Sequence, residues 1–437
     1  MIADGSPPTS ASAGAEKGQI ARRLVLFLYG FEMRGVKVPY RNFAADFEKH
    51  KQLTGAKGTV SALEPPPFDK PWLKGWRANL TEPGAEPVET VFDFLEWQDL
   101  IPRRHRFRFL RLSLLGITTL FAMLRRGIQF KMLRYSKSHG ILAIFPFLAL
   151  ALYLWIMATL VWAGFSLARA YGPVAMAIGT AIGIGLAAGF YLLTLRIDRR
   201  LHVWPQITFW NFHYRHGGRG NPAVEARFAS FADHALERLH DHSFDEIIVV
   251  SVSSAGYYTI EMLGRMLERD PDLAGRRVAL LTFGVQPSIT SWFGPRKNFV
   301  QALTSVLKSP AIEWLAYSMR GDIMTVAEYD PFRDVGLDRK EFDQQKIIHH
   351  RIHLKRMLTP SSMQAVRRDF LWLHLHYLRT SETGDEHDFF AIACTSLPTL
   401  AAAKVWRERA LAARTMPASE VAAVAAQKGA LTAADVQ

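Results

Sequence analysis

Two long runs without a charged residue constrain this chain more than any other feature of its sequence. They cover residues 141–168 and 170–195, and only a short turn that begins at Arg169 separates them. Each run is longer than the roughly 20 residues that an α-helix needs to cross the hydrocarbon of a bilayer. The sequence therefore predicts a transmembrane helical hairpin at 141–195, with a buried pair of core helices in a soluble protein as the alternative. Small residues on the second helix, which let two backbones approach closely, are Gly179, Gly183, Gly185 and Gly189.

The excess of positive charge lies beside these runs. The chain carries 53 Lys and Arg against 40 Asp and Glu, a formal net charge of +13. Residues 101–197 contain twelve Lys and Arg and neither Asp nor Glu, so this stretch holds nearly all of the excess. A nucleic-acid-binding protein spreads its basic residues over a folded surface, whereas cations that bracket apolar helices are typical of proteins at a membrane. We therefore expect membrane lipids as a partner, and no nucleic acid.

The charges that flank the two runs also predict an orientation. Positively charged flanks of a transmembrane helix stay in the cytoplasm. Both ends of the predicted hairpin are basic, with cations at Lys131, Arg134, Lys137, Arg196, Arg199 and Arg200. The sequence thus predicts a protein of the inner, cytoplasmic membrane with two spans, whose termini and soluble parts all face the cytoplasm.

A basic region at residues 101–140 precedes the hairpin. Within it, residues 112–124 are apolar but too short to span a bilayer, and basic clusters lie at both ends. This arrangement predicts an interfacial helix that lies on anionic lipid. An ordinary helix packed on the soluble domain is the alternative.

The segments on either side of the hairpin region, residues 21–100 and 196–400, are predicted to form the two parts of one α/β domain. Apolar runs that suit buried strands lie at 24–30, 90–95, 247–250, 277–283 and 312–317, and helical patterns lie at 41–51, 221–241 and 257–269. Strands that alternate with helices imply a mostly parallel sheet with helices on both faces. Residues 1–20 lack the pattern of a signal peptide and are expected to be a disordered tail. Residues 401–437 are expected to be an Ala-rich helix that ends in a tail.

The stretch IIVVSVSSAG, residues 247–256, predicts a buried strand followed by a sharp turn into a helix. A serine on such a turn stands clear of the sheet, and the tight backbone requires small residues two positions before and after it. Around Ser253 these are Ser251 and Ala255. Ser253 is therefore a candidate nucleophile, and the N–H of Ser254 is a candidate donor to an oxyanion. The alternative is a strand–helix turn built from small residues for packing alone.

A nucleophilic serine needs a base, and the base needs an acid that orients it. Asp322 follows a predicted strand and a glycine, where such an acid is expected, and Asp330 is the alternative. His374, between two leucines, is the favoured base, with His376 and His387 as alternatives. An Asp that caps a turn and a structural His on an apolar helix face are the competing interpretations.

An oxyanion hole also needs a second N–H donor, usually from the loop after an early strand. Gly30 and Phe31 lie at such a place, at the end of the run LVLFLYG. A glycine there would let the backbone approach a ligand closely. The alternative is an ordinary glycine that ends a strand.

Other cofactor and metal chemistries lack their sequence patterns. The chain contains no Gly-x-x-x-x-Gly-Lys-Ser/Thr loop, no Gly-x-Gly-x-x-Gly after a strand and no His-Glu-x-x-His. Its one cysteine, Cys394, excludes internal disulfide bonds and zinc clusters built from cysteines. We expect neither a cofactor nor a metal ion.

Together these residues resemble the α/β-hydrolase superfamily, in particular its lipase-like and esterase-like members. The matching parts are YGF at 29–31, VSVSSAG at 250–256, GDIM at 321–324 and a histidine downstream. The resemblance implies Ser253 as nucleophile, Asp322 as acid and His374 as base, acting through an acyl-enzyme intermediate. The chain departs from the family pattern because Ser251 and Ala255 replace the usual glycines. The whole is similar to uncharacterised bacterial membrane proteins with a hydrolase-like domain.

The sequence therefore leads to two hypotheses about function. In the first, the protein is a membrane-anchored serine hydrolase with a hydrophobic ester substrate, a lipid or an acyl ester that partitions into the bilayer. In the second, it is a non-catalytic membrane protein that uses a degenerate hydrolase fold to bind a partner or a lipid, and Ser253 is a packing residue.

Overall fold

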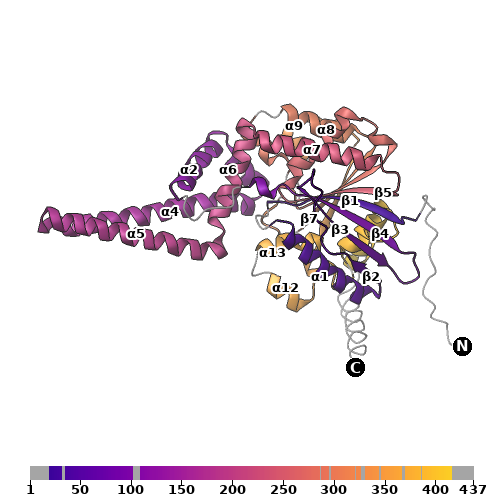
Figure 1. Ribbon diagram of the computed structural model, residues 1–437, viewed down its shortest axis with the longest axis horizontal. Helices are drawn as coiled ribbons and strands as arrows, with labels where there is room; N and C mark the ends of the chain where they lie inside the picture. The colour runs from indigo at the N-terminus through magenta and orange to yellow at the C-terminus, as the bar shows by residue number, and fades with distance from the viewer. Residues whose placement is uncertain are drawn as a thin grey trace, which may run out of the picture.

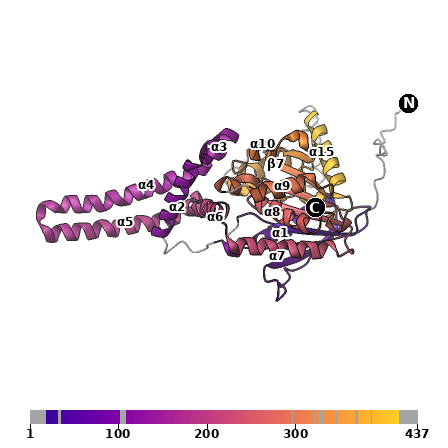
Figure 2. The same ribbon diagram turned by 90° about the horizontal axis from the view of Figure 1, so that it is seen from above.

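A computed structural model of the protein describes residues 19–31, 35–101, 109–285, 287–294, 297–319, 321–325, 330–343, 346–366, 370–384 and 386–415. It contains an α/β domain and, projecting from it, two long antiparallel helices (Figures 1 and 2). The tail predicted at residues 1–20 lies outside the described residues except for its last two. Of the segment predicted at 401–437, the structure describes the part up to residue 415.

The α/β domain is built on one eight-stranded sheet with the strand order β2-β3-β4-β1-β5-β6-β7-β8. The pairs from β4 through β1 to β8 are all parallel, and β2-β3 and β3-β4 are antiparallel. The predicted α/β class with a mostly parallel sheet is therefore confirmed. The strands are β1 (Arg22–Leu28), β2 (Lys57–Val60), β3 (Leu73–Thr81), β4 (Val88–Leu95), β5 (Glu246–Val252), β6 (Val278–Phe283), β7 (Ile312–Met319) and β8 (Ile347–Ile352).

The two parts of the chain that flank the helical hairpin contribute neighbouring strands to this sheet. Strand β1 lies between β4, from the first part, and β5, from the second, with Leu28 opposite Ser251. The central strands are continuous apolar runs because both of their faces are covered. The sheet is therefore a single structure in which segments more than 200 residues apart in sequence pair directly, as with Arg23 and Glu246.

Helices cover both faces of the sheet, as the sequence predicts (Figure 1). One face packs on α7 (Pro222–Leu239), α8 (Ala255–Arg269) and α9 (Lys297–Lys308). The other packs on α1 (Lys37–Thr54), α14 (Phe389–Ala393) and α15 (Thr399–Thr415). The shorter elements are α10 (Pro331–Val335), α11 (Leu354–Met357), α12 (Pro360–Val366), α13 (Phe370–His374), η1 (Gln98–Leu100), η3 (Leu273–Gly275), η4 (Pro287–Phe293), η5 (Arg339–Glu341) and η6 (Leu375–Leu378).

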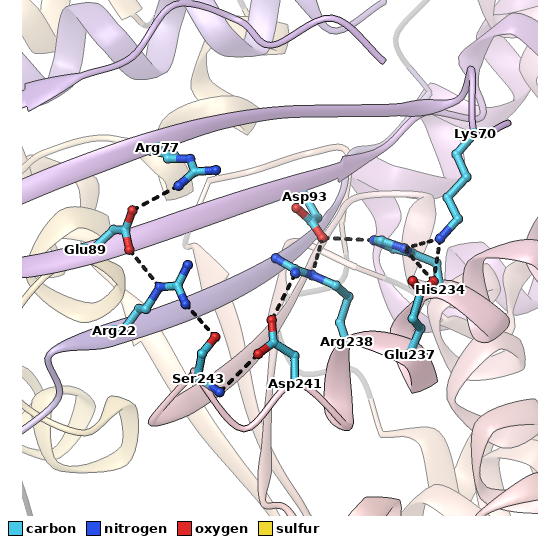
Figure 3. A network of polar contacts seen from close by, with 10 residues as sticks. All are labelled: Arg22, Lys70, Arg77, Glu89, Asp93, His234, Glu237, Arg238, Asp241 and Ser243. Carbon is cyan, nitrogen blue, oxygen red and sulfur yellow. Dashed lines mark hydrogen bonds and ion pairs between the residues drawn. The ribbon is translucent and has the colours of Figure 1, made fainter. Parts of the chain in front are cut away.

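A network of ion pairs joins strands β1 and β4 of the sheet to α7 (Figure 3). Asp93 of β4 accepts hydrogen bonds from Arg238 Nε at 3.0 Å and pairs with His234 Nε2 at 2.9 Å. Arg22 of β1 bonds Glu89 of β4 at 2.7 Å. The network fixes α7 on the sheet, and we assign it a structural role.

A helical insertion, residues 109–219, lies between β4 and α7. It comprises α2 (Phe109–Arg125), α3 (Ile128–Tyr135), α4 (Lys137–Ala168), η2 (Arg169–Tyr171), α5 (Pro173–Leu201) and α6 (Val203–Arg219). Helices α4 and α5 are long and apolar enough to cross a membrane, within Lys137–Tyr171 and Pro173–Asp198. Only 28% and 11% of their most apolar windows are buried. The pair is thus mostly exposed, which a pair of core helices in a soluble protein is not.

Glycines bring the two long helices together, although two of the four expected ones do not take part. A Cβ atom added to Gly164 would lie 2.2 Å from Gly179 O, and one added to Gly183 would lie 2.7 Å from Leu160 O. An added Cβ at Gly185 or Gly189 would meet no atom within 4 Å. Gly179 and Gly183 therefore pack as predicted, whereas Gly185 and Gly189 face away from α4.

Helix α2 is apolar on two opposite faces. Its buried face packs on α4 and α6 through Leu112, Gly116 and Met123, among others. Its outer face carries an exposed apolar stripe: Leu110, Leu114, Ile117, Phe121 and Leu124. Helix α2 therefore packs on other helices of the insertion, and the interfacial position of its outer face stays a prediction.

Candidate active site

Ser253 occupies a strained turn between β5 and α8. Its φ angle is 55°, in the left-handed region that non-glycine residues rarely adopt. The turn is held by a hydrogen bond from Ser253 N–H to Phe283 O of 2.9 Å. Its neighbours Ser251 and Ala255 are fully buried. A left-handed residue other than glycine costs roughly 1–2 kcal/mol, and such strain tends to be retained at functional sites.

Gly30, at the end of the neighbouring strand β1, makes close contact with this turn. A Cβ atom added to Gly30 would lie 2.8 Å from Ser253 Cβ and 3.0 Å from Val252 O. Real side chains do not fit at such distances, so the position requires glycine. The loop after β1 and the serine turn therefore lie directly side by side at the carboxyl edge of the sheet, where ligands bind in open α/β sheets.

The N–H of Phe31 already has a partner in this structure. It donates a hydrogen bond of 3.0 Å to Ser254 Oγ. The Phe31 ring packs edge-on against Phe209 of α6, with ring centroids 5.2 Å apart. Ser254 directly precedes α8, and the first N–H groups of a helix have no partner within the helix. The three predicted oxyanion donors thus surround Ser253, with one of their N–H groups engaged.

Asp322 and His374 form a buried pair. His374 Nδ1 lies 2.7 Å from Asp322 Oδ2, and the two side chains are 1% and 0% exposed. Asp322 follows β7, and His374 ends α13. Tyr377 O–H also donates to Asp322 Oδ2 at 3.0 Å, and Met324 N–H donates to Oδ1 at 2.9 Å. The carboxylate is therefore held from several directions.

This setting keeps Asp322 ionised. Burial alone raises the pKa of the Asp322 carboxyl, but the charge and the hydrogen bond of His374 lower it, as do the bonds from Met324 and Tyr377. The net pKa lies below its ordinary value. A carboxylate only accepts hydrogen bonds, so His374 carries a proton on Nδ1. In the neutral ring, Nε2 is then a lone-pair acceptor, which is the form that a general base requires.

His374 Nε2 is buried and has no hydrogen-bond partner among the described residues, Ser253 included. The loop after β6 lies between the two groups. Phe283 O accepts the hydrogen bond from Ser253 N–H, and a Cβ atom added to the next residue, Gly284, would lie 3.1 Å from His374 Cε1. The imidazole and the serine therefore flank the same turn of backbone.

The alternative acid and bases are engaged elsewhere. Asp330 Oδ1 accepts the N–H of Phe332 at 3.1 Å, and Asp330 also pairs with Arg339 at 3.0 Å. His376 Nδ1 bonds Trp372 O, and His387 Nε2 bonds Tyr377 O, both at 2.7 Å. Burial lowers the pKa of both imidazoles to about 4. Among the described residues, Asp322 pairs with His374 and with neither of these histidines.

Three residues at this site were not singled out from the sequence. Tyr377 binds the carboxylate, and its spacing of three residues from His374 was a usable signal, because such residues share a face of a helical turn. Gly284 has a φ of 56°, and its ring neighbours leave no room for a side chain. His139, in α4, contacts the backbone beside Asp322. Nothing in the local sequence around Gly284 or His139 indicates these contacts.

The helical insertion packs against the segments that carry the site. Phe209 and Phe212 of α6 contact Phe31, which follows β1. His213 Nδ1 of α6 lies 2.6 Å from Thr290 Oγ1 in η4, which follows β6. His139 Nδ1 of α4 lies 3.3 Å from Ile323 O, which follows β7. The insertion thus lies at the carboxyl edge of the sheet, on the candidate site.

No three His, Cys, Asp or Glu residues within the described ranges are grouped so that they could hold a metal ion.

No protein-family model, no curated protein and no solved structure matches this chain.

Proposed function

We propose that this protein is a membrane-anchored serine hydrolase related to the α/β-hydrolases, which cleaves a lipid or another acyl ester. One observation carries the proposal. A serine in the left-handed conformation at a strand–helix turn and a buried Asp322–His374 pair, whose imidazole Nε2 has no hydrogen-bond partner among the described residues, flank the same turn of backbone after β6. A turn built for packing alone would not need the buried pair.

In the proposed reaction, Ser253 Oγ attacks the ester carbonyl carbon while its proton passes to His374 Nε2. Asp322 holds the imidazole by Nδ1 and stabilises the imidazolium that forms. The carbonyl oxygen, now an oxyanion, accepts hydrogen bonds from backbone N–H groups beside the turn. The bond to the alcohol then breaks, and the leaving oxygen takes the proton from Nε2. Water attacks the acyl-enzyme through the same proton relay and releases the carboxylic acid.

The backbone N–H of Ser254 and that of Gly30 or Phe31 are the proposed oxyanion donors. Phe31 N–H must leave Ser254 Oγ, 3.0 Å away, before it can serve an oxyanion. Rotation of the Ser254 side chain is the change proposed to release it. This site therefore requires a local adjustment when substrate binds, as catalytic hydrogen bonds in unliganded enzymes often do.

The substrate class follows from the surroundings of the site. Helices α4 and α5 are proposed to span the membrane, and the exposed apolar stripe of α2 is proposed to rest in its interface. Exposed cations on and between α2, α3 and the start of α4 make no ion pair among the described residues and suit anionic headgroups: Arg111, Arg125, Arg126, Arg134 and Lys137. By the positive-inside rule we place the domain in the cytoplasm. A site fixed there favours an ester that partitions into the bilayer.

Hydrolysis of a series of p-nitrophenyl esters, from acetyl to dodecanoyl, tests the proposal with the full-length protein in detergent or nanodiscs. We expect turnover by the wild type that grows with chain length and is lost in Ser253→Ala. Ser230→Ala is the matched control, because Ser230 lies on the exposed side of α7 and bonds only its own helix backbone, at 3.1 Å. Turnover that survives in Ser253→Ala removes the nucleophile assignment.

The second candidate function is a non-catalytic membrane protein that binds a partner or a lipid. The engaged Phe31 N–H and the missing bond between His374 Nε2 and Ser253 favour it. In that case no ester is turned over by a well-folded wild type. Binding of anionic vesicles would remain, and substitution of Ser253 would not change it.

A further inference from the structure

The first membrane helix reaches the loop that carries the acid. His139, the third residue of α4, places Nδ1 3.3 Å from Ile323 O. Ile323 directly follows Asp322 in the chain. His139 is 6% exposed, so water does not compete for this contact. Its ring is also close enough to Asp322 and His374 to interact with both electrostatically.

The partner of Nδ1 fixes the tautomer of His139. A carbonyl oxygen only accepts, so Nδ1 carries the proton and donates it to Ile323 O. Nε2 is buried and has no hydrogen-bond partner among the described residues. The hydrogen bond that the ring makes is therefore the one to Ile323 O, in the loop at residues 321–325 that carries Asp322 (the acid loop).

The rest of this junction holds the same part of the domain. Tyr135 O–H, at the end of α3, donates to Asp334 Oδ1 at 3.1 Å. Ala143 and Phe147 of α4 share a buried cluster with Trp292 and Phe293 of η4. The base of the hairpin thus packs on the segments that follow both β6 and β7. Between them these segments contact His374, through Gly284, and carry Asp322.

We propose that His139 is a positioning residue, which holds the backbone at Ile323 so that Asp322 meets His374 in the geometry that the base needs. The membrane hairpin then helps to position the residues of the active site, in addition to anchoring the protein in the membrane. The expected effect of His139 on the reaction rate rests on the proposed hydrolase function. The contact by which His139 holds the loop does not depend on that function. A small displacement of a catalytic group is enough to slow an enzyme severely.

Two near-isosteric substitutions of His139 distinguish the effect of losing the hydrogen-bond donor from the effect of changing the volume of the side chain. In His139→Asn the side-chain amide can donate from about the position of Nδ1, whereas in His139→Gln the amide lies at about the position of Nε2. Gln129→Met is the control for the junction, because Gln129 Nε2 donates to Gly140 O, at 2.6 Å, in the same buried region. That bond belongs to the insertion alone and does not touch the acid loop.

The test measures two quantities on each full-length variant in nanodiscs. One is the rate of phosphonate labelling of Ser253, and the other is amide hydrogen exchange of residues 321–325. We expect His139→Gln to label about tenfold more slowly, which corresponds to about 1.4 kcal/mol, and to exchange faster in that segment. His139→Asn should stay within about threefold of the wild type, because its amide keeps a donor for the hydrogen bond to Ile323 O. Gln129→Met should lower the thermal midpoint and leave both quantities unchanged.

The outcomes test the role of His139 and the hydrolase function separately. If His139→Gln and His139→Asn match the wild type in exchange, His139 does not hold the loop and the inference is wrong. If they differ in exchange and not in labelling, the loop is held but its position does not govern the rate, which also contradicts the inference. A wild type that is never labelled overturns the hydrolase proposal, while exchange still reports whether His139 holds the acid loop.

Discussion

Asp322 and His374 meet at 2.7 Å, although 52 residues separate them in the chain. One follows β7, the strand next to the edge strand β8, and the other ends a short helix. Tyr377 closes the arrangement from the next turn by donating to the same carboxylate oxygen. The pair therefore links the loop after β7 to the helical segment after α12, and its burial makes each partner depend on the other.

Substitution Asp322→Asn tests the orientation of the base. The amide can donate to His374 Nδ1 and so favours the wrong tautomer, in which Nε2 holds the proton. We expect the rate of Ser253 acylation to fall by roughly 10³–10⁴-fold, as in related triads. Asp330→Asn is the control, because Asp330 bonds Phe332 N–H and Arg339 instead. A similar loss in both variants, measured by stopped-flow ester cleavage, would contradict the assignment of the acid.

The stability contributed by Asp322 should depend on pH. Its folded-state pKa lies below the ordinary value, so the folded state favours the charged form. This contribution is fully present above the unfolded-state pKa of about 3.9 and is lost as the pH falls through the folded-state pKa. The difference in thermal midpoint between the wild type and Asp322→Asn should therefore shrink below about pH 4. A difference that stays constant from neutral pH down to that range would show that Asp322 is not held as a carboxylate.

The left-handed backbone of Ser253 predicts a difference between two inactive variants. Ser253→Gly and Ser253→Ala both remove the hydroxyl, but only glycine adopts a φ of 55° without strain. We expect the glycine variant to be more stable than the alanine variant by about 1 kcal/mol. Thermal unfolding of the two detergent-solubilised proteins measures this. Equal stability would mean that the turn relaxes and stores no strain.

The reactivity of introduced cysteines can show which helices lie in the membrane, because the native cysteine is not expected to react with a maleimide. Cys394 is fully buried, and burial raises the pKa of its thiol to about 12. Single cysteines at Phe121 of α2, at Trp162 of α4 and at the exposed control position Phe68 therefore report alone. In proteoliposomes an impermeant maleimide should react with the first two about tenfold more slowly than with the control, since the thiolate forms poorly in apolar surroundings.

The readout needs one normalisation. Each rate is divided by the labelling of the same sample after denaturation in SDS, so that samples with different amounts of reactive thiol can be compared. Slow reaction at Trp162 with fast reaction at Phe121 would place the hairpin in the bilayer and α2 outside it. Fast reaction at both positions would mean that neither helix lies in the membrane.

The central part of the fold could be predicted because its signals are local. The run IIVV ends in small residues and is followed by a helical pattern, which fixes β5, the turn and α8 within a few residues. The uncharged runs likewise predict the two long helices, because length and composition alone decide whether a helix can span a bilayer.

Other elements were missed for physical reasons. Strand β3 alternates in burial along LKGWRANLT, and the short β2 pairs with it at the edge of the sheet. Neither has the continuous apolar run of a central strand. His349 and His350 lie on the edge strand β8, where His350 stacks on Tyr317 with ring centroids 4.8 Å apart. Polar residues on the exposed side of an edge strand resemble a loop in sequence.

The site itself could be predicted only as a set of candidates. Nothing local distinguishes His374 from His376, which lies two residues away and points to Trp372 O instead. The choice depends on how α13 docks against the loop after β7, and that is decided by tertiary packing. The contact of His139 with Ile323 spans 184 residues and has no signature in either segment.

The most direct test of the account is the reaction of the purified protein with a fluorophosphonate, followed by peptide mapping of the adduct. We predict one adduct, located on Ser253, that is absent from Ser253→Ala and strongly reduced in His374→Ala. This result would show a serine activated by its base in an acyl-transfer site. A folded wild type that forms no adduct, or an adduct on another serine, would contradict the hydrolase assignment and favour a membrane protein that binds without catalysis.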